Sequence, residues 1–193
     1  MVAASDCEHC RPGLISQPAN TVSSLAYVAA GADLLRRPEP DRAFAWAVIA
    51  VGLGSVAYHG PGGTLGKWAH DGSLIAMLGL LALTDVTTAD GRPLPDGAVA
   101  GVVATAAVTA HPRTTDYAQV GVGALAIVAE ARRHVRGASV REAAIGGPLM
   151  AAGLLLHVFG RTGERWCRPG SLLQPHAAWH TLSAAALWTR RRF

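Results

Sequence analysis

Apolar residues are concentrated in seven runs along the chain, separated by short segments that carry most of the charged residues. The runs span about 21–35, 43–59, 68–84, 97–110, 115–131, 143–160 and 175–189. They are rich in Ala, Leu and Gly and lack the strict alternation of strands, which favours helices. Each is somewhat shorter than the roughly 20 residues that a typical bilayer requires, and loop residues extend several of them. The pattern predicts an all-α fold, an integral membrane bundle of seven transmembrane helices.

The composition supports this interpretation. Of the 193 residues, 50% are hydrophobic and only 16% are charged, against about 25% charged in a soluble domain. The length predicts a single domain over 1–193. The net charge of +4 does not indicate nucleic-acid binding, because the arginines lie in short loops between apolar runs. The first 20 residues are polar and predict no cleavable signal peptide.

The distribution of basic residues predicts the orientation in the membrane. If the seven runs cross the membrane in turn, eleven of the 17 Lys and Arg residues fall on one side. Cytoplasmic loops of membrane proteins usually carry such an excess of Lys and Arg. These eleven are Arg36, Arg37, Arg42, Arg92, Arg132, Arg133, Arg136, Arg141, Arg190, Arg191 and Arg192. The N-terminus is therefore expected outside and the C-terminus in the cytoplasm. The end of the second run and the starts of the first, third and seventh runs then meet on the outer side.

Three histidines occupy these outer positions. His176 and His180 stand four apart at the start of the last run, so they share one face of a helix. His59 ends the second run. Ionisable residues in spanning helices usually face the bundle interior or a wet cavity. Three neutral imidazoles suit a catalytic zinc, which keeps its fourth position open for water.

Two further outer residues fit the chemistry of a zinc hydrolase. Asp71 is the only acidic residue between 68 and 84 and is the candidate for proton transfer. Ser55 lies one helical turn before His59 and could stabilise a developing oxyanion, although a small residue there also suits helix contact. His70 is expected to cap a helix or face the loop, and His157 to be a packed residue.

The order and spacing of these motifs resemble the alkaline ceramidase family. The similarity rests on Ser55-x-x-x-His59, on Asp71 twelve positions later, and on His176-x-x-Trp179-His180. The Cys7-Glu8 pair ahead of Asn20-Thr21-x-Ser23, and Cys167 before the last run, also match that family. The family belongs to a wider group of seven-span hydrolases and receptors that includes the progestin and adiponectin receptors.

The resemblance implies Zn2+ on His59, His176 and His180, with Asp71 and Ser55 beside it. It implies hydrolysis of the amide bond of ceramide-like lipids in the membrane to a sphingoid base and a fatty acid. Two positions depart from the family pattern, because Ser24 stands in place of Asn and Gln17 in place of Glu. The second departure makes the Ca2+ of eukaryotic members doubtful here, with Glu8 and Asp6 as the remaining acidic candidates.

The predicted topology places Cys7 and Cys167 on one oxidising face, and the resemblance points to the same pair as a disulfide. Cys10 would remain free. The alternative is a second metal site formed by Cys7, His9 and Cys10, which has no fourth ligand nearby.

Two other functions are compatible with the sequence. A receptor or structural membrane protein would use a zinc closed by a fourth protein ligand, such as His70 or Asp71. A transporter would use the histidines as a proton relay, but the inner halves of the second, third and seventh runs lack ionisable residues. Acyl-chain length, head group and oligomeric state are not predicted.

Overall fold

The computed structural model describes residues 5–89, 94–95 and 97–190. Over these ranges it contains seven helices: α1 (Pro18–Leu35), α2 (Arg42–His59), α3 (Gly63–Ala89), α4 (Ala98–Thr109), α5 (Thr115–Val135), α6 (Val140–Phe159) and α7 (Pro175–Thr189). Each contains most of one predicted apolar run, and α3 begins five residues before its run and ends five after. The all-α class is therefore confirmed. Arg92, Arg191 and Arg192, used to predict the orientation, lie outside the described residues.

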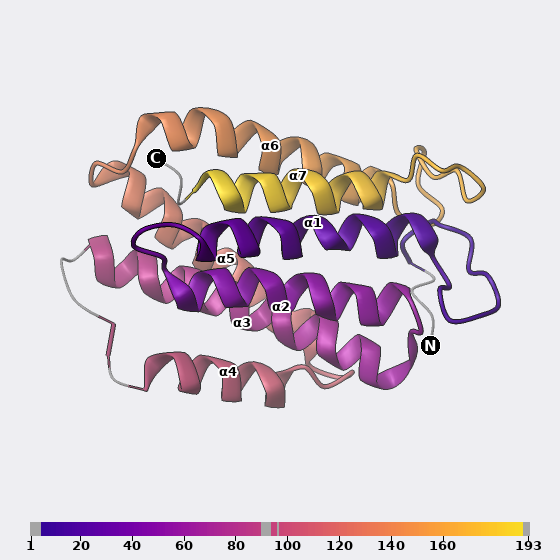
Figure 1. Ribbon diagram of the computed structural model, residues 1–193, viewed down its shortest axis with the longest axis horizontal. Coiled ribbons are helices and arrows are strands. Elements are labelled where there is room, and N and C mark those ends of the chain that lie inside the picture. Colours follow the sequence, from indigo (N-terminus) through magenta and orange to yellow (C-terminus); the bar gives the residue numbers. More distant parts are fainter. Residues whose placement is uncertain (1–4, 90–93, 96, 191–193) are drawn as a thin grey trace.

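The helices run roughly side by side along the long axis of the molecule (Figure 1). α1 packs between α2 and α7, and α3 lies on the other side of α2. α5 and α4 pack against α3, while α6 packs against α7. Because α1 touches both α2 and α7, the last turn of α2 and the first turn of α7 come together at one end of the bundle.

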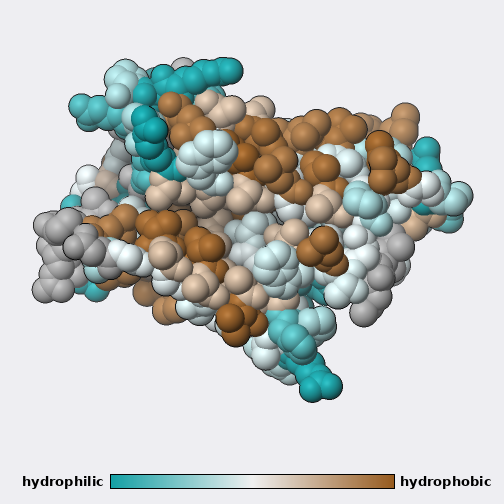
Figure 2. Space-filling model, turned by 60° about the horizontal axis from the view of Figure 1, so that its bottom comes forward, coloured by the Kyte–Doolittle hydropathy of each residue, from teal (hydrophilic) through white to brown (hydrophobic). Residues whose placement is uncertain are grey.

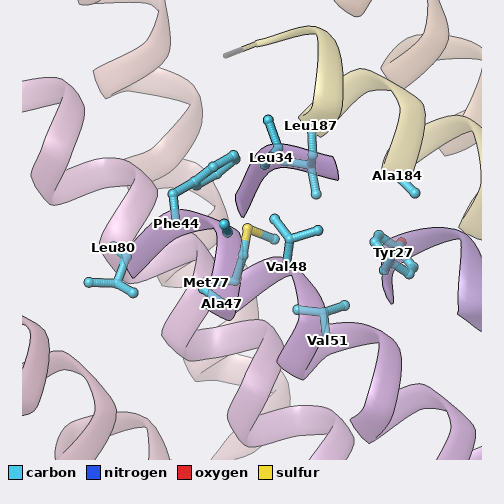
Figure 3. Close-up of a cluster of buried hydrophobic side chains, with 11 residues drawn as sticks. Tyr27, Leu34, Phe44, Ala47, Val48, Val51, Met77, Leu80, Ala184 and Leu187 are labelled. Carbon is cyan, nitrogen blue, oxygen red and sulfur yellow. The ribbon is translucent and has the colours of Figure 1, made fainter. Parts of the chain in front are cut away.

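The apolar core lies between α1, α2, α3 and α7 (Figure 3). Its largest members include Tyr27, Leu34, Phe44, Met77 and Leu187. Their close packing stabilises the contacts between these four helices through many small dispersion contacts. The two helices that carry the three histidines, α2 and α7, are thus held by a common core.

Two glycines let α2 approach both neighbours closely. A Cβ on Gly52 would lie 3.0 Å from the carbonyl oxygen of Ser24 in α1, and one on Gly54 would lie 2.7 Å from that of Ala69 in α3. Small residues of this kind allow backbones to come into contact. They bring α1 and α3 against the half of α2 that ends in His59.

Two helices, α3 over Gly63–Thr87 and α6 over Val140–Phe159, are long and apolar enough to cross a membrane. This is weak support for a membrane protein, and the seven-span topology stays a prediction. Large apolar side chains are also exposed on α5 and α6, among them Leu125, Ile127, Leu154 and Leu155. Figure 2 shows apolar side chains over the middle of one face and hydrophilic ones mainly at its edges. Extended apolar surface of this kind marks contact with lipid or another protein.

A cluster of ion pairs joins four helices at the opposite end from His59. Arg133 of α5 pairs with Glu142 of α6 at 2.5 Å and with Glu130 at 3.0 Å, and approaches Asp85 of α3 at 3.7 Å. Arg190, which follows α7, pairs with both Asp85 and Glu130. Asp85 is fully buried, so these partners offset the cost of removing its charge from water.

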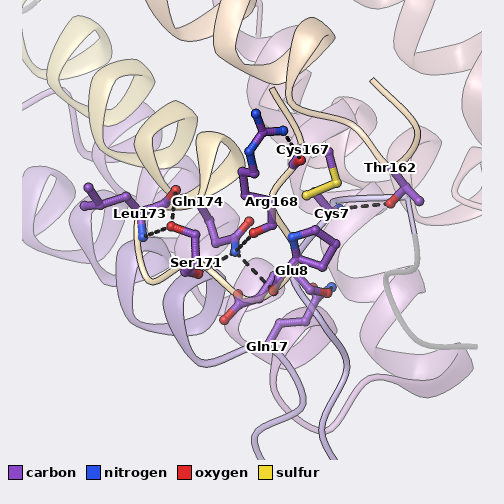
Figure 4. The surroundings of a disulfide bond; sticks show 10 residues. Cys7, Glu8, Gln17, Thr162, Cys167, Arg168, Ser171, Leu173 and Gln174 are labelled. Carbon is purple, nitrogen blue, oxygen red and sulfur yellow. Dashed lines mark hydrogen bonds between the residues drawn. A yellow bond between two sulfur atoms is a disulfide. The ribbon is translucent and has the colours of Figure 1, made fainter. Parts of the chain in front are cut away.

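A disulfide joins Cys7 to Cys167 at the end of the bundle that holds His59 (Figure 4). The predicted pairing is present, and Cys10 is free. The bridge links the segment before α1 to the connection between α6 and α7. Thr162 of that connection also accepts a hydrogen bond from the Cys7 backbone N–H at 3.0 Å.

We expect the double variant Cys7→Ser/Cys167→Ser to unfold at a lower temperature than the wild type. The bridge closes a loop of 160 residues, and losing such a cross-link costs about 2–5 kcal/mol. The thermal midpoint of the purified protein checks this, with Cys10→Ser as the control. An unchanged midpoint in the double variant would show that the bridge does not stabilise the fold.

Candidate metal centre

The structure brings His59, His176 and His180 together. The ring centroids of His59 lie 5.1 Å from those of both His176 and His180, and the latter two are 4.5 Å apart. One nitrogen from each ring lies within 4.8 Å of the others. The three residues are 0%, 6% and 2% exposed, respectively. Three neighbouring imidazoles are therefore sequestered from solvent at one end of the bundle.

The helix ends place these rings. His59 is the last residue of α2, and Gly60 follows it as the C-cap. Pro175 occupies the first position of α7, where its fixed φ suits the start of a helix. His176 therefore lies in the first turn, and His180 lies one turn later on the same face.

Hydrogen bonds fix the tautomer of His59. The Nε2 of Gln17 donates to the carbonyl oxygen of Glu8 at 2.9 Å, so its Oε1 is the atom that faces His59. The Nδ1 of His59 donates to that oxygen at 2.7 Å. A neutral ring that carries its proton on Nδ1 has a free lone pair on Nε2. The Nε2 of His59 is therefore available as a ligand.

The same argument applies to His180. Its Nδ1 lies 2.9 Å from the Oγ of Ser23 and 3.3 Å from the Oγ of Ser24. Both hydroxyls donate their single proton to the carbonyl oxygen of Asn20. With both protons on that carbonyl, the serine oxygens accept from the Nδ1 of His180, which leaves the lone pair on Nε2.

His176 has two polar neighbours on its Nδ1 side. The Nδ1 of His157 in α6 lies 3.3 Å away, and the Oδ1 of Asp6 lies 3.8 Å away. Burial raises the pKa of the Asp6 carboxyl above its usual value, although a hydrogen bond from Ser5 opposes this. His157, expected to be a packed residue, thus contacts one of the three central rings.

The Nε2 atoms of His59 and His176 are buried and make no hydrogen bond within the described part of the chain. A buried polar atom without a partner is costly. A cation shared by the three rings would satisfy both atoms. Metal-binding histidines almost always donate their other ring nitrogen to a protein acceptor, as His59 and His180 do here. The donor set therefore fits a metal ion.

Asp71 is buried on α3 and lies outside the group of three histidines. Its carboxylate accepts hydrogen bonds from Lys67 at 2.6 Å, one turn earlier, and from Gln119 of α5 at 3.2 Å. The Nδ1 of His70 lies 2.9 Å from Oδ1, the oxygen that also accepts from Gln119. The predicted acid is thus held by three neighbours.

His70 lies between Asp71 and the central rings. Its ring centroid is 6.2 Å from that of His59 and 5.1 Å from that of Tyr58. The expectation that His70 only caps a helix or faces the loop was therefore incomplete. Ser55 is buried on α2 one turn before His59, as the spacing predicted.

Glu8 caps the start of α1. Its two carboxylate oxygens accept backbone N–H groups of Ala19 at 2.8 Å and Asn20 at 2.9 Å, where the helix dipole favours negative charge. Gln17 is neutral, and calcium affinity depends on the charge of the ligands. This segment therefore gives little support to calcium binding.

An apolar pocket of about 590 Å³ lies between α2, α3 and α4. Trp46, Trp68, Leu80 and Val103 line it, and none of the three histidines does. The pocket is therefore separate from the candidate metal centre.

Comparisons were made with protein-family models, curated proteins and solved structures. Nothing matches this chain. The resemblance to the alkaline ceramidases therefore rests on the sequence motifs alone.

Proposed function

We propose that this chain is an integral membrane, zinc-dependent amidohydrolase of the alkaline ceramidase type. Its proposed substrates are ceramide-like N-acyl lipids, which it cleaves to an amine or sphingoid base and a fatty acid. The observation that carries the proposal is the convergence of three buried imidazoles, two of which are fixed with Nε2 as the free ligand atom.

Zinc is the favoured metal. Neutral imidazoles suit zinc, and three protein ligands with one open position are typical of catalytic rather than structural zinc. When bound, zinc polarises a carbonyl and lowers the pKa of water. Calcium has no part in the proposed reaction, because Glu8 is engaged in capping α1 and Gln17 carries no charge.

Side chains of the protein carry out proton transfer and stabilise the oxyanion. Asp71 accepts a proton from the attacking water and passes it to the departing amine. Lys67 and Gln119 orient the Asp71 carboxylate through their hydrogen bonds. Ser55 donates a hydrogen bond to the oxyanion as it develops. Each of these groups acts without being a metal ligand.

We further propose that all seven helices span the membrane, with the N-terminus outside and the C-terminus in the cytoplasm. The excess of arginine at one end supports this orientation. The disulfide lies at the end with the histidines, consistent with an oxidising outer compartment. The substrate enters sideways from the bilayer, because its chains are apolar.

The alternative is a receptor or structural protein whose zinc is closed by a fourth protein ligand. The two candidates for that ligand are His70 and Asp71. Among the described residues, neither His70 nor Asp71 belongs to the group whose ligand atoms lie within 4.8 Å of one another. This separation favours the enzyme, with an open fourth position, over the structural zinc.

Metal analysis of the purified protein, followed by assay of a panel of N-acyl lipids by mass spectrometry, tests the proposal. We expect about one zinc per chain and release of both the fatty acid and the amine. Removal of the metal with a chelator should stop the release, and added zinc should restore it. Zinc without hydrolysis of any lipid amide would favour the structural alternative.

A further inference from the structure

Gln17 makes two hydrogen bonds to a single candidate ligand. Its backbone N–H donates to the carbonyl oxygen of His59 at 3.0 Å, and its Oε1 accepts from the Nδ1 of the same residue at 2.7 Å. Gln17 is fully buried and immediately precedes α1. It therefore holds both the backbone and the ring of His59.

The amide of Gln17 cannot be turned around without losing contacts. Its Nε2 faces the carbonyl oxygen of Glu8 at 2.9 Å and the Sγ of Cys10 at 3.7 Å, and a carbonyl can only accept. Its Oε1 also accepts from the Nδ2 of Asn20 at 3.3 Å. This fixed amide determines which nitrogen of His59 carries the proton.

Gln17 also connects His59 to the segment that precedes α1. Figure 4 shows Gln17 next to Glu8, and the Nε2 of Gln17 donates to the Glu8 carbonyl oxygen. Glu8 in turn follows Cys7, which the disulfide fastens to the connection between α6 and α7. One side chain thus carries two separable functions, an acceptor toward His59 and a donor toward the segment.

We propose that Gln17 is a positioning residue for the metal, acting through His59. Its oxygen keeps the Nε2 lone pair of His59 directed at the point that His176 and His180 share. The inference rests on the proposed zinc centre and adds a residue that the motifs of that centre do not include. Loss of such an outer hydrogen bond typically lowers metal affinity about 10–100-fold.

Two substitutions of Gln17 separate its two functions. Gln17→Met keeps the length of the side chain and removes both the acceptor and the donor. Gln17→Glu keeps an oxygen for His59 and removes the donor to Glu8. We expect Gln17→Met to bind zinc about 10–100-fold more weakly than the wild type, and Gln17→Glu to bind it at least as tightly, because a carboxylate makes the imidazole a stronger ligand.

Gln174 supplies a matched control. It is a second buried glutamine, and its Nε2 donates to the backbone oxygens of Arg168 and Ser171 at 3.0 and 2.6 Å. Gln174→Met therefore removes a comparable anchor without removing the partner of His59. We expect its zinc affinity to stay within a few-fold of the wild type.

The experiment measures zinc affinity of the full-length purified proteins by competition with a chelator, and cobalt(II) absorption as a second readout. Equal affinity in Gln17→Met and wild type would overturn the positioning role and leave the metal centre intact. An equal loss of zinc affinity in Gln17→Glu and Gln17→Met would also overturn it, because the effect would then come from losing the Nε2 donor to Glu8. A wild type that binds no zinc would overturn the proposed centre together with this inference. If Gln17→Met does not accumulate, Gln17→Asn, which is one methylene shorter, replaces it.

Discussion

His176→Ala is expected to remove bound zinc and to reduce amide hydrolysis to background while the protein still folds. The ring contributes one of the three candidate ligands that lie together in the described part of the chain. Zinc sites with four ligands bind with roughly 10–16 kcal/mol, so the loss of one nitrogen removes about 3 kcal/mol, or over 100-fold in affinity. Zinc content and product release, measured on the same preparation, check this expectation.

An exposed histidine provides the control for His176. His111 lies in the connection between α4 and α5, outside the cluster of three rings. His111→Ala should keep wild-type zinc content and turnover. Normal hydrolysis by a metal-free His176→Ala protein would refute the zinc mechanism.

Asp71→Asn is expected to slow amide hydrolysis about 100- to 10,000-fold, the usual contribution of general acid–base catalysis. Zinc content should remain unchanged, because Asp71 is not part of the histidine group. The amide can still bond to its neighbours but cannot accept the proton of the attacking water. Turnover number and zinc content of the variant, measured together, test both statements.

A distant carboxylate serves as the comparison for Asp71. Asp33 near the end of α1 is exposed and bonds to Arg37 and Trp188, so Asp33→Asn should retain full turnover. If Asp71→Asn lost its zinc, Asp71 would be a ligand, and the structural alternative would gain support. If it kept full activity, another group would have to transfer the proton.

The helices and the three central histidines could be predicted from sequence because both depend on spacing. The apolar runs coincide with helices, and His176 and His180 share a face by their interval of four. His59 was predicted to lie near them because runs that alternate across a membrane place the end of the second run and the start of the seventh on the same side. The proximity of the three rings could therefore be predicted from the order of the helices alone.

The partners of these rings could not be predicted in the same way. Gln17 and Ser23 have no periodic pattern that links them to histidines more than 40 positions away. Their contacts depend on the path of the segment before α1 and on the rotation of α1 between its neighbours. His157 likewise reaches His176 only because α6 packs against α7.

The surroundings of Asp71 are an intermediate case. Lys67 lies one helical turn before it, and that interval was visible in the sequence. The contact with Gln119 could not be predicted, because it depends on α5 packing against α3 rather than against the intervening α4. The sequence thus identified the acid but not what holds it.

Two of the three central imidazoles belong to α7, which leaves the ribosome after the other six helices. A nascent chain that has completed α2 carries one of the three central histidines, His59, and no partner ligand from α7. Metal loading of the proposed centre would therefore follow synthesis of the last helix. A product truncated before α7 would also lack Arg190, which pairs with Asp85 at the other end of the bundle. Incomplete chains would thus lose one of the two arginines beside the buried Asp85 carboxylate and keep only Arg133 of α5 near it.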